Sequence, residues 1–199
     1  GEFDGLVDRF WGDTAFDGGP WLLSTLWYGQ FYARRAENTA GCADIDRLKA
    51  VIDRVQGTLG PAGLASDQVA SDDSLLYPGE DDFRLEAAWP SSGNTAAALV
   101  DSLLMFLDAR PDAPGSVIRL APKLPTGWNT LTARNVRIGG RSVDVTVTQS
   151  ATRSTHAIRN NAGGAMGCET WIRVPPGAVI TFVKQGDTPV PYTFEPGSC

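Results

Sequence analysis

The sequence predicts an α+β chain in two parts, with helices in residues 1–112 and an antiparallel β-sandwich-like module in residues 113–199. Three observations lead to this fold class. Apolar residues recur with a helical period in the first part, and they alternate with polar residues in the second. Between the two patterns lies the stretch ARPDAPG at residues 109–115, whose prolines and glycine are typical of a boundary.

The first predicted helix spans residues 20–35. Pro20 suits its first turn, where the missing N–H is not needed, and Arg34 and Arg35 suit the negative C-terminal end of the helix dipole. The apolar side chains of this segment cover more than one face, so we expect a helix that is surrounded by other helices. These side chains are Trp21, Leu22, Leu23, Leu26, Trp27, Phe31 and Tyr32.

Two more helices are predicted, at residues 43–57 and 95–108. In the first of them, apolar residues at i, i+3 and i+4 spacing alternate with charged residues, which is typical of a half-exposed helix. The second is apolar and rich in alanine, and Pro111 closes it. The three segments therefore indicate apolar inner helices alternating with amphipathic outer ones.

The β module is predicted from its alternating runs. Two such runs flank Gly139-Gly140, and a pair of glycines in this position predicts a β-hairpin. Further strands are expected at residues 153–159, 169–174 and 178–185, separated by turns that contain proline or glycine.

Composition excludes several classes of function. The 199 residues carry a net charge of -6, and Arg34-Arg35 is their only adjacent basic pair, so we expect no nucleic-acid partner. The sequence lacks an uncharged apolar run of about 18 residues, so we expect no membrane partner. Phosphate-loop, dinucleotide and CxxC motifs are absent and His156 is the single histidine, so we expect no metal and no cofactor.

The three cysteines, Cys42, Cys168 and Cys199, lie far apart. A bridge between Cys168 and Cys199 would tie the C-terminus to a strand, whereas the alternative is three scattered thiols. The possible bridge favours a secreted or periplasmic protein.

Carboxylates and aromatic residues gather in the loops next to the helices. Pyranose rings stack on aromatic faces, and a pair of carboxyl groups on opposite sides of a glycosidic bond can hydrolyse it, so this composition is typical of sugar chemistry. For the run DDSLLYPGEDDF, a solvated acidic loop is the other interpretation.

The stretch DRFWGDTAFDGGPWLLSTLWYGQFYA at residues 8–33 resembles the glucoamylases of glycoside hydrolase family 15. In that family an Arg-aromatic-x-x-Asp-Thr segment leads into Gly-x-Pro-Trp and an inner helix of an (α/α)6 barrel. The resemblance implies that Arg9 hydrogen-bonds sugar hydroxyls, that Trp21 lines the site, and that Asp13 and Trp89 are further substrate-binding residues. The other interpretation of this segment is a plain core helix whose tryptophans fill space.

The resemblance continues in GPAGLASDQVASDD, where the family has Ser-Glu-Gln and the glutamate is the general base. This chain has Asp67-Gln68 instead, and the shorter side chain places its carboxylate about 1.5 Å further back. The resemblance implies that Asp67 is the catalytic base, with Glu80 or Glu86 as the alternatives.

The resemblance also implies that the chain is part of a larger enzyme. The general acid of the family lies upstream, so the chain is interpreted as the last helices of an (α/α)6 barrel followed by a β-sandwich cap. Its N-terminal half would be a docked partner without which the chain is inactive. The implied activity is exo-acting, inverting hydrolysis of α-glucosidic bonds in oligo- or polysaccharides, with carboxyl groups roughly 6.5–9.5 Å apart.

Two other functions remain open. A non-catalytic carbohydrate-binding or scaffold protein derived from such a hydrolase would explain the change from glutamate to aspartate. A sugar phosphorylase that shares the barrel is a third possibility, and the lack of a basic phosphate site counts against it.

Overall fold

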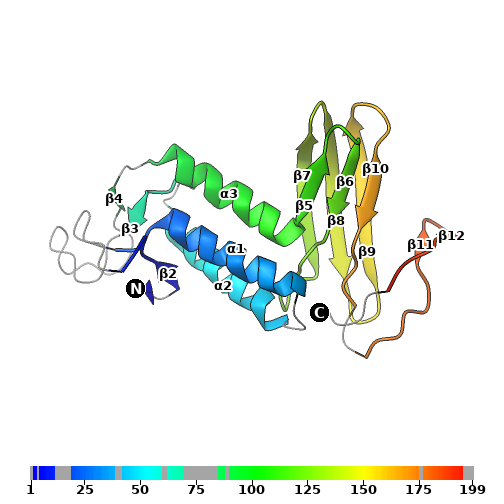
Figure 1. The fold of residues 1–199 in the computed structure, drawn as a ribbon, viewed down its shortest axis with the longest axis horizontal. Coiled ribbons are helices and arrows are strands. Elements are labelled where there is room, and N and C mark those ends of the chain that lie inside the picture. The colour runs from blue at the N-terminus through cyan, green and yellow to red at the C-terminus, as the bar shows by residue number, and fades with distance from the viewer. Residues whose placement is uncertain are drawn as a thin grey trace.

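The computed structural model describes residues 2–3, 5–11, 19–38, 42–59, 62–69, 85–87, 90–174 and 177–194. In these residues a layer of helices is joined end-on to a β module (Figure 1). This is the predicted α+β order, although a complete barrel of helices is not present in the described residues.

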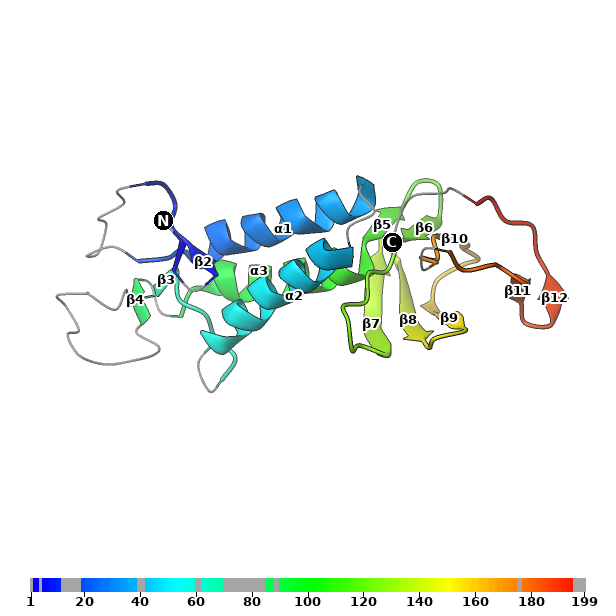
Figure 2. The ribbon, with the colours of Figure 1, turned by 90° about the horizontal axis from the view of Figure 1, so that it is seen from below.

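Three helices lie side by side, as Figure 2 shows. They are α1 (Leu22–Asn38), α2 (Cys42–Gly57) and α3 (Ser92–Leu107), so the predicted helices are confirmed with ends shifted by up to three residues. Gly29 lets them approach, because a Cβ at this position would lie 3.3 Å from the sulfur of Met105 on α3 and 3.4 Å from Val51 on α2. No helix within the described ranges has the length and apolar character needed to cross a membrane.

The first hydrophobic core lies between the helices. Each helix contributes to it, and short strands at the far end close it. Its buried residues are Leu6, Leu22, Leu26, Ala33, Leu48, Ile52, Val55, Ala65, Val69, Ala98, Met105 and Phe106. Among the described residues, the expectation that α1 is surrounded on all sides is not met, because Trp27 is 59% and Phe31 50% exposed.

Short strand pairs lie at the end of the helical layer that is distant from the β module (Figure 1). β1 (Glu2–Phe3) pairs with β2 (Leu6–Val7), and β3 (Gln68–Val69) pairs with β4 (Leu85–Ala87), both antiparallel.

The β module consists of two sheets. One has the order β10-β6-β5, from β5 (Ala109–Asp112), β6 (Val117–Leu120) and β10 (Gly167–Thr170). The other has the order β7-β8-β9, from β7 (Thr130–Ile138), β8 (Arg141–Gln149) and β9 (Ser154–Ala162). A second core lies between the sheets, with Ile118 and Leu120 of one and Val143, Val145 and Val147 of the other. The module is therefore sandwich-like.

Several strand predictions need correction. The hairpin at Gly139-Gly140 is confirmed, and Gly139 has the positive φ of 59° that primed hairpin turns require. The expected boundary stretch 109–115 instead begins with strand β5, which pairs with β6. The sheets are also not purely antiparallel, because the chain crosses from β9 to the other sheet and β10 runs parallel to β6.

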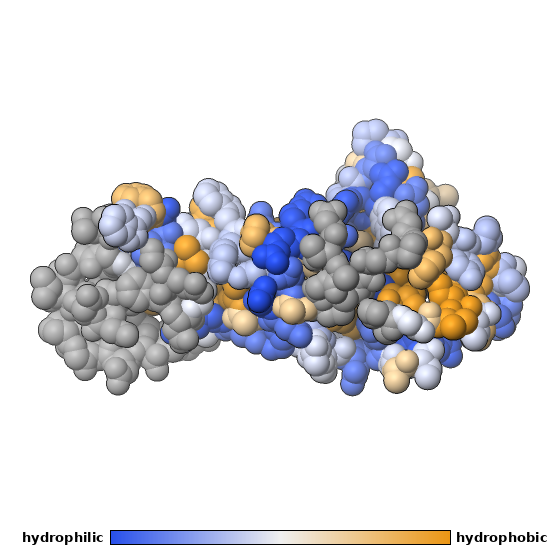
Figure 3. Space-filling view, turned by 60° about the horizontal axis from the view of Figure 1, so that its bottom comes forward, coloured by the Kyte–Doolittle hydropathy of each residue, from blue (hydrophilic) through white to orange (hydrophobic). Residues whose placement is uncertain are grey.

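The C-terminal segment lies outside the two sheets. Of the expected strand 178–185, only β11 (Lys184–Gln185) is paired, in a short hairpin with β12 (Thr188–Pro189). Residues 178–183 pair with no strand in the described part of the chain, and Val179 and Phe182 are exposed. Apolar side chains gather at this end of the molecule in Figure 3.

An ion cluster in which Lys123 and Asp108 are buried and Arg110 is exposed joins the helices to the sheets. Asp108 turns the chain out of α3 in a left-handed conformation (φ 45°), and its carboxylate accepts hydrogen bonds from Lys123 Nζ at 2.7 Å and from Arg110 Nε and Nη2 at 2.9 Å each. Glu37 at the end of α1 accepts from Arg110 at 3.0 Å, and Arg173 Nη1 donates to the carbonyl of Ala36 at 3.0 Å. The cluster therefore connects α1, α3 and the β module.

Candidate functional site

The candidate site lies where the N-terminal ends of α1 and α3 meet β3 (Figure 1). Backbone hydrogen bonds bring these segments together. The Leu22 N–H donates to the Asp67 carbonyl at 3.1 Å, the Val69 N–H donates to the Pro20 carbonyl at 3.0 Å, and Trp21 pairs with Gln68 as an isolated bridge. As a result, the backbone of Asp67 lies beside that of Trp21 although the two residues are 46 positions apart in the sequence.

Asp67 is half-buried, and α3 fixes its carboxylate. Asn94 Nδ2 donates to Asp67 Oδ1 at 3.0 Å and to the Ser66 carbonyl at 3.0 Å. Asn94 is itself held in the first turn of α3, where its N–H donates to the capping hydroxyl of Ser91. Within the described part of the chain, Asp67 Oδ2 has no hydrogen-bond partner, so one oxygen is fixed and the other can accept a proton or orient a water molecule.

Arg9 and Trp21 form the second part of the site. The guanidinium of Arg9 lies 3.9 Å from the centre of the Trp21 ring, a cation–π contact that keeps the ring and the arginine together. Trp21 Nε1 is buried and finds no acceptor among the described residues. The ring of Phe10, which is exposed, has its centre 5.5 Å from the Arg9 guanidinium, and Trp11 is 93% exposed.

The structure thus brings the backbone of Asp67 beside that of Trp21 and Leu22, and it brings the Arg9 guanidinium onto the Trp21 ring. Asp13, Trp89 and the alternative base Glu80 lie outside the described residues, and Glu86 lies in β4 with its side chain outside them.

The sequence analysis did not identify Asn94 as a site residue, and it named Gln68 only as the neighbour of Asp67. Gln68 is fully buried, and its amide donates to the Gly19 carbonyl at 3.2 Å, which holds the loop before α1 against β3. The helix-capping pattern Ser91-x-x-Asn94 was the available signal for Asn94, but it predicts a helix start and not a contact with Asp67.

Other reactive groups lie away from this site. His156 Nδ1 is 2.6 Å from the hydroxyl of Thr170, and burial lowers the pKa of His156. Cys168 is a free thiol whose pKa is raised by burial and by Glu169, while Cys199 lies outside the described residues. Among the residues that the structure describes, His, Cys, Asp and Glu side chains form no group of three or more suited to a metal ion.

Trp128 supports the junction between the helices and the sheets. Its ring packs against Phe106 of α3 with the centroids 4.9 Å apart, and it is partly buried against the helical core.

Part of the β module matches a known protein family. A helical layer joined to a β-sandwich-like module is the class of fold that the structure defines. Residues 112–158 match the family model described as glycosyl hydrolase family 65, C-terminal domain. The match runs from the end of β5 into β9, relates this part of the chain to a domain of glycoside hydrolases, and does not point to family 15. No match was found among curated proteins or among solved structures.

Proposed function

We propose that the chain forms the C-terminal part of a glycoside hydrolase that cleaves α-glucosidic bonds from chain ends with inversion. In this proposal Asp67 is the general base that activates water, and Arg9 and Trp21 hold the sugar next to it. The observation that carries the proposal is the hydrogen bond from Asn94, which fixes one oxygen of Asp67 and leaves the other available. The family match of the β module and the resemblance of residues 8–33 to glucoamylases support the same class of reaction.

The general acid belongs, in this proposal, to a preceding helical segment that packs on α1 and α3. Apolar side chains on these helices support such packing, because a monomer seldom leaves so many of them exposed together. The exposed residues are Leu23, Trp27 and Phe31 on α1 and Leu99, Val100 and Leu104 on α3. Secretion or export to the periplasm stays a prediction.

The test is hydrolysis of maltose, isomaltose and dextran by the longer enzyme that contains this chain. Asp67→Asn should lower kcat by a factor of about 100 or more, because removal of a positioned general base typically costs 10²–10⁴-fold. The matched control is Asp53→Asn on α2, which removes an exposed carboxylate that pairs with Lys49 and should leave kcat unchanged. Activity that survives Asp67→Asn would refute the assignment of the base.

The stereochemistry can be tested separately. Proton NMR during the first minutes of hydrolysis should show β-glucose as the first product of an α-linked substrate if water attacks directly. A first product with the α configuration would refute inversion. Binding of these sugars without turnover, in the presence of the N-terminal half, would favour a non-catalytic carbohydrate-binding protein.

A further inference from the structure

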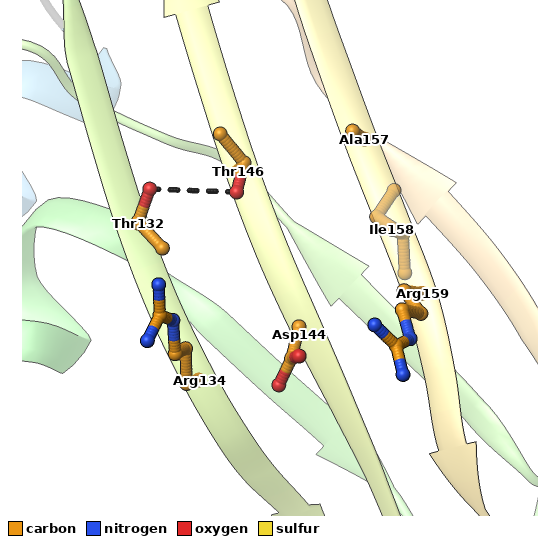
Figure 4. A pocket seen from close by; sticks show the side chains of 7 residues that line it. All are labelled: Thr132, Arg134, Asp144, Thr146, Ala157, Ile158 and Arg159. Atoms are coloured by element: carbon orange, nitrogen blue, oxygen red, sulfur yellow. Dashed lines mark hydrogen bonds between the residues drawn. The ribbon is translucent and has the colours of Figure 1, made fainter.

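The outward face of the sheet β7-β8-β9 carries a polar array that the proposed reaction does not use. The inward side chains Val143, Val145 and Val147 are buried against the other sheet, so the alternate residues face outward. Figures 1 and 2 show the other sheet on the opposite side and no element of the described chain over this face. An open hollow of about 670 Å³ lies on it. It is lined by Thr132, Arg134, Asp144, Thr146, Ala157, Ile158 and Arg159 (Figure 4).

A β-bulge holds the carboxylate at the centre of this array. The register between β7 and β8 shifts between Ala133 and Val136, and Asn135 takes a left-handed conformation with φ 57°. This conformation directs the Asn135 N–H to Asp144 Oδ1 at 2.9 Å, and Asn161 Nδ2 donates to the same oxygen at 2.6 Å. Bulges commonly aim side chains at functional positions.

The two hydrogen bonds from Asn135 and Asn161 lower the pKa of Asp144, so it is ionised at neutral pH. Both donors bind Oδ1, and Oδ2 has no hydrogen-bond partner in the described ranges. Oδ1 of the carboxylate is thus fixed by two hydrogen bonds, and Oδ2 can accept a hydrogen bond from a ligand.

Two arginines flank this carboxylate. Arg134 on β7 and Arg159 on β9 lie on either side of Asp144 in Figure 4. In the part of the chain that the structure describes, neither guanidinium makes a hydrogen bond or an ion pair. In the next row, the hydroxyls of Thr132 and Thr146 are 3.4 Å apart, and the small side chain of Ala157 leaves the hollow open beside them.

We propose that this face is a second saccharide-binding site, for a neutral oligosaccharide. Vicinal hydroxyl groups of a sugar can donate to Asp144 Oδ2 and accept from Arg134 and Arg159, so one ligand would satisfy donors and acceptor together. A phosphate or a carboxylate would use the arginines but would be repelled by Asp144 between them. The site lies on the β module and does not depend on catalysis at Asp67, although the choice of an α-glucan as ligand rests on the proposed function.

The test uses the longer enzyme that contains this chain, with these 199 residues labelled with ¹⁵N and with Asp67→Asn to prevent hydrolysis, titrated with maltoheptaose. Backbone amide signals of Thr132, Arg134, Asp144, Thr146 and Arg159 should shift, with a Kd of about 1 mM or below. Asp144→Asn should weaken binding by at least about fivefold, because it removes the charged acceptor. The matched control Asp187→Asn lies in the exposed turn between β11 and β12 and should leave the Kd unchanged. The amide spectrum of each variant shows directly whether it is folded.

Three results would overturn the inference. One is the absence of shifts on this face at about 10 mM maltoheptaose, and another is equal binding by Asp144→Asn. The third is a larger response to inorganic phosphate than to maltoheptaose, which would indicate an anion site. Shifts confined to the residues around Asp67 would refute the second site while supporting the proposed function, and loss of turnover on Asp67→Asn tests that function separately.

Discussion

Replacement of Lys123 by methionine tests whether the ion cluster stabilises the junction between the helices and the sheets. Lys123 is 1% exposed, and its Nζ lies 2.7 Å from Asp108 Oδ2 and 3.8 Å from Glu37 Oε1. Methionine retains most of the buried volume, so the substitution removes the charge without opening a large cavity.

The expected loss of stability in Lys123→Met depends on the hydrogen bonds that Asp108 retains. Removal of one partner from a buried ion pair costs about 3–5 kcal/mol, because the other charge remains buried without its partner. Asp108 retains two hydrogen bonds from Arg110, which places the loss at the lower end, at about 3 kcal/mol. With an m-value of about 2–3 kcal/mol/M, the midpoint of urea unfolding should fall by about 1–1.5 M.

The loss should depend on pH. Burial acts to raise the pKa of Asp108, but the hydrogen bonds from Arg110 and Lys123 outweigh it and hold this pKa below the ordinary value. A carboxyl group with a lowered folded-state pKa contributes stability above its unfolded pKa of about 3.9, and this contribution is lost as the pH falls through the folded-state value. The difference between the original protein and Lys123→Met should therefore be complete at pH 7 and shrink below about pH 4.

Urea unfolding followed by circular dichroism, at pH 7 and below about pH 4, measures these differences in the free energy of unfolding. The exposed Lys184→Met is the matched control and should change the free energy of unfolding by less than about 0.5 kcal/mol. The double variant Lys123→Met with Asp108→Asn should lose less than the sum of the single variants, because no carboxylate is then left without its partner. A loss below about 0.5 kcal/mol for Lys123→Met at pH 7, or equal losses at both pH values, would refute the reasoning.

Three further predictions concern the site and its supports. Asn94→Ala removes the hydrogen bond to Asp67 and should lower the free energy of unfolding by about 1–2 kcal/mol, with a fall in kcat of the longer enzyme greater than any rise in KM. Gly29→Val should cost about 2 kcal/mol or more, because even a Cβ there would lie 3.3 Å from a core side chain, whereas Gly29→Ala should be near neutral since alanine favours the helix. Trp128→Ala should cost about 2–3 kcal/mol through the lost contact with Phe106 and should leave maltoheptaose binding unchanged.

Urea unfolding measures all three losses, and each prediction can fail separately. A normal kcat in Asn94→Ala would show that Asp67 needs no positioning by this amide. Equal stability of Gly29→Val and Gly29→Ala would show that the helices can separate at this point. Weaker maltoheptaose binding by a folded Trp128→Ala would identify Trp128 as a sugar contact.

The sequence by itself determined the three helices, the hairpin at Gly139-Gly140 and the order of helices before strands. These features depend on local periodicity and turn chemistry, which neighbouring residues encode. It also determined which residues to examine as a site, since Arg9, Trp21 and Asp67 stood in a recognisable pattern.

Only the tertiary structure decided which of those residues meet and what holds them. The contact of Asn94 with Asp67 joins residues 27 positions apart, and the ion cluster joins Glu37 to Arg110 and Lys123 at the end of the helical layer next to the sheets. The parallel pairing of β10 with β6 and the array around Asp144 likewise depend on which strands become neighbours. Local periodicity carries no information about such neighbours, because long-range contacts are fixed by how buried surfaces and charges fit together in space.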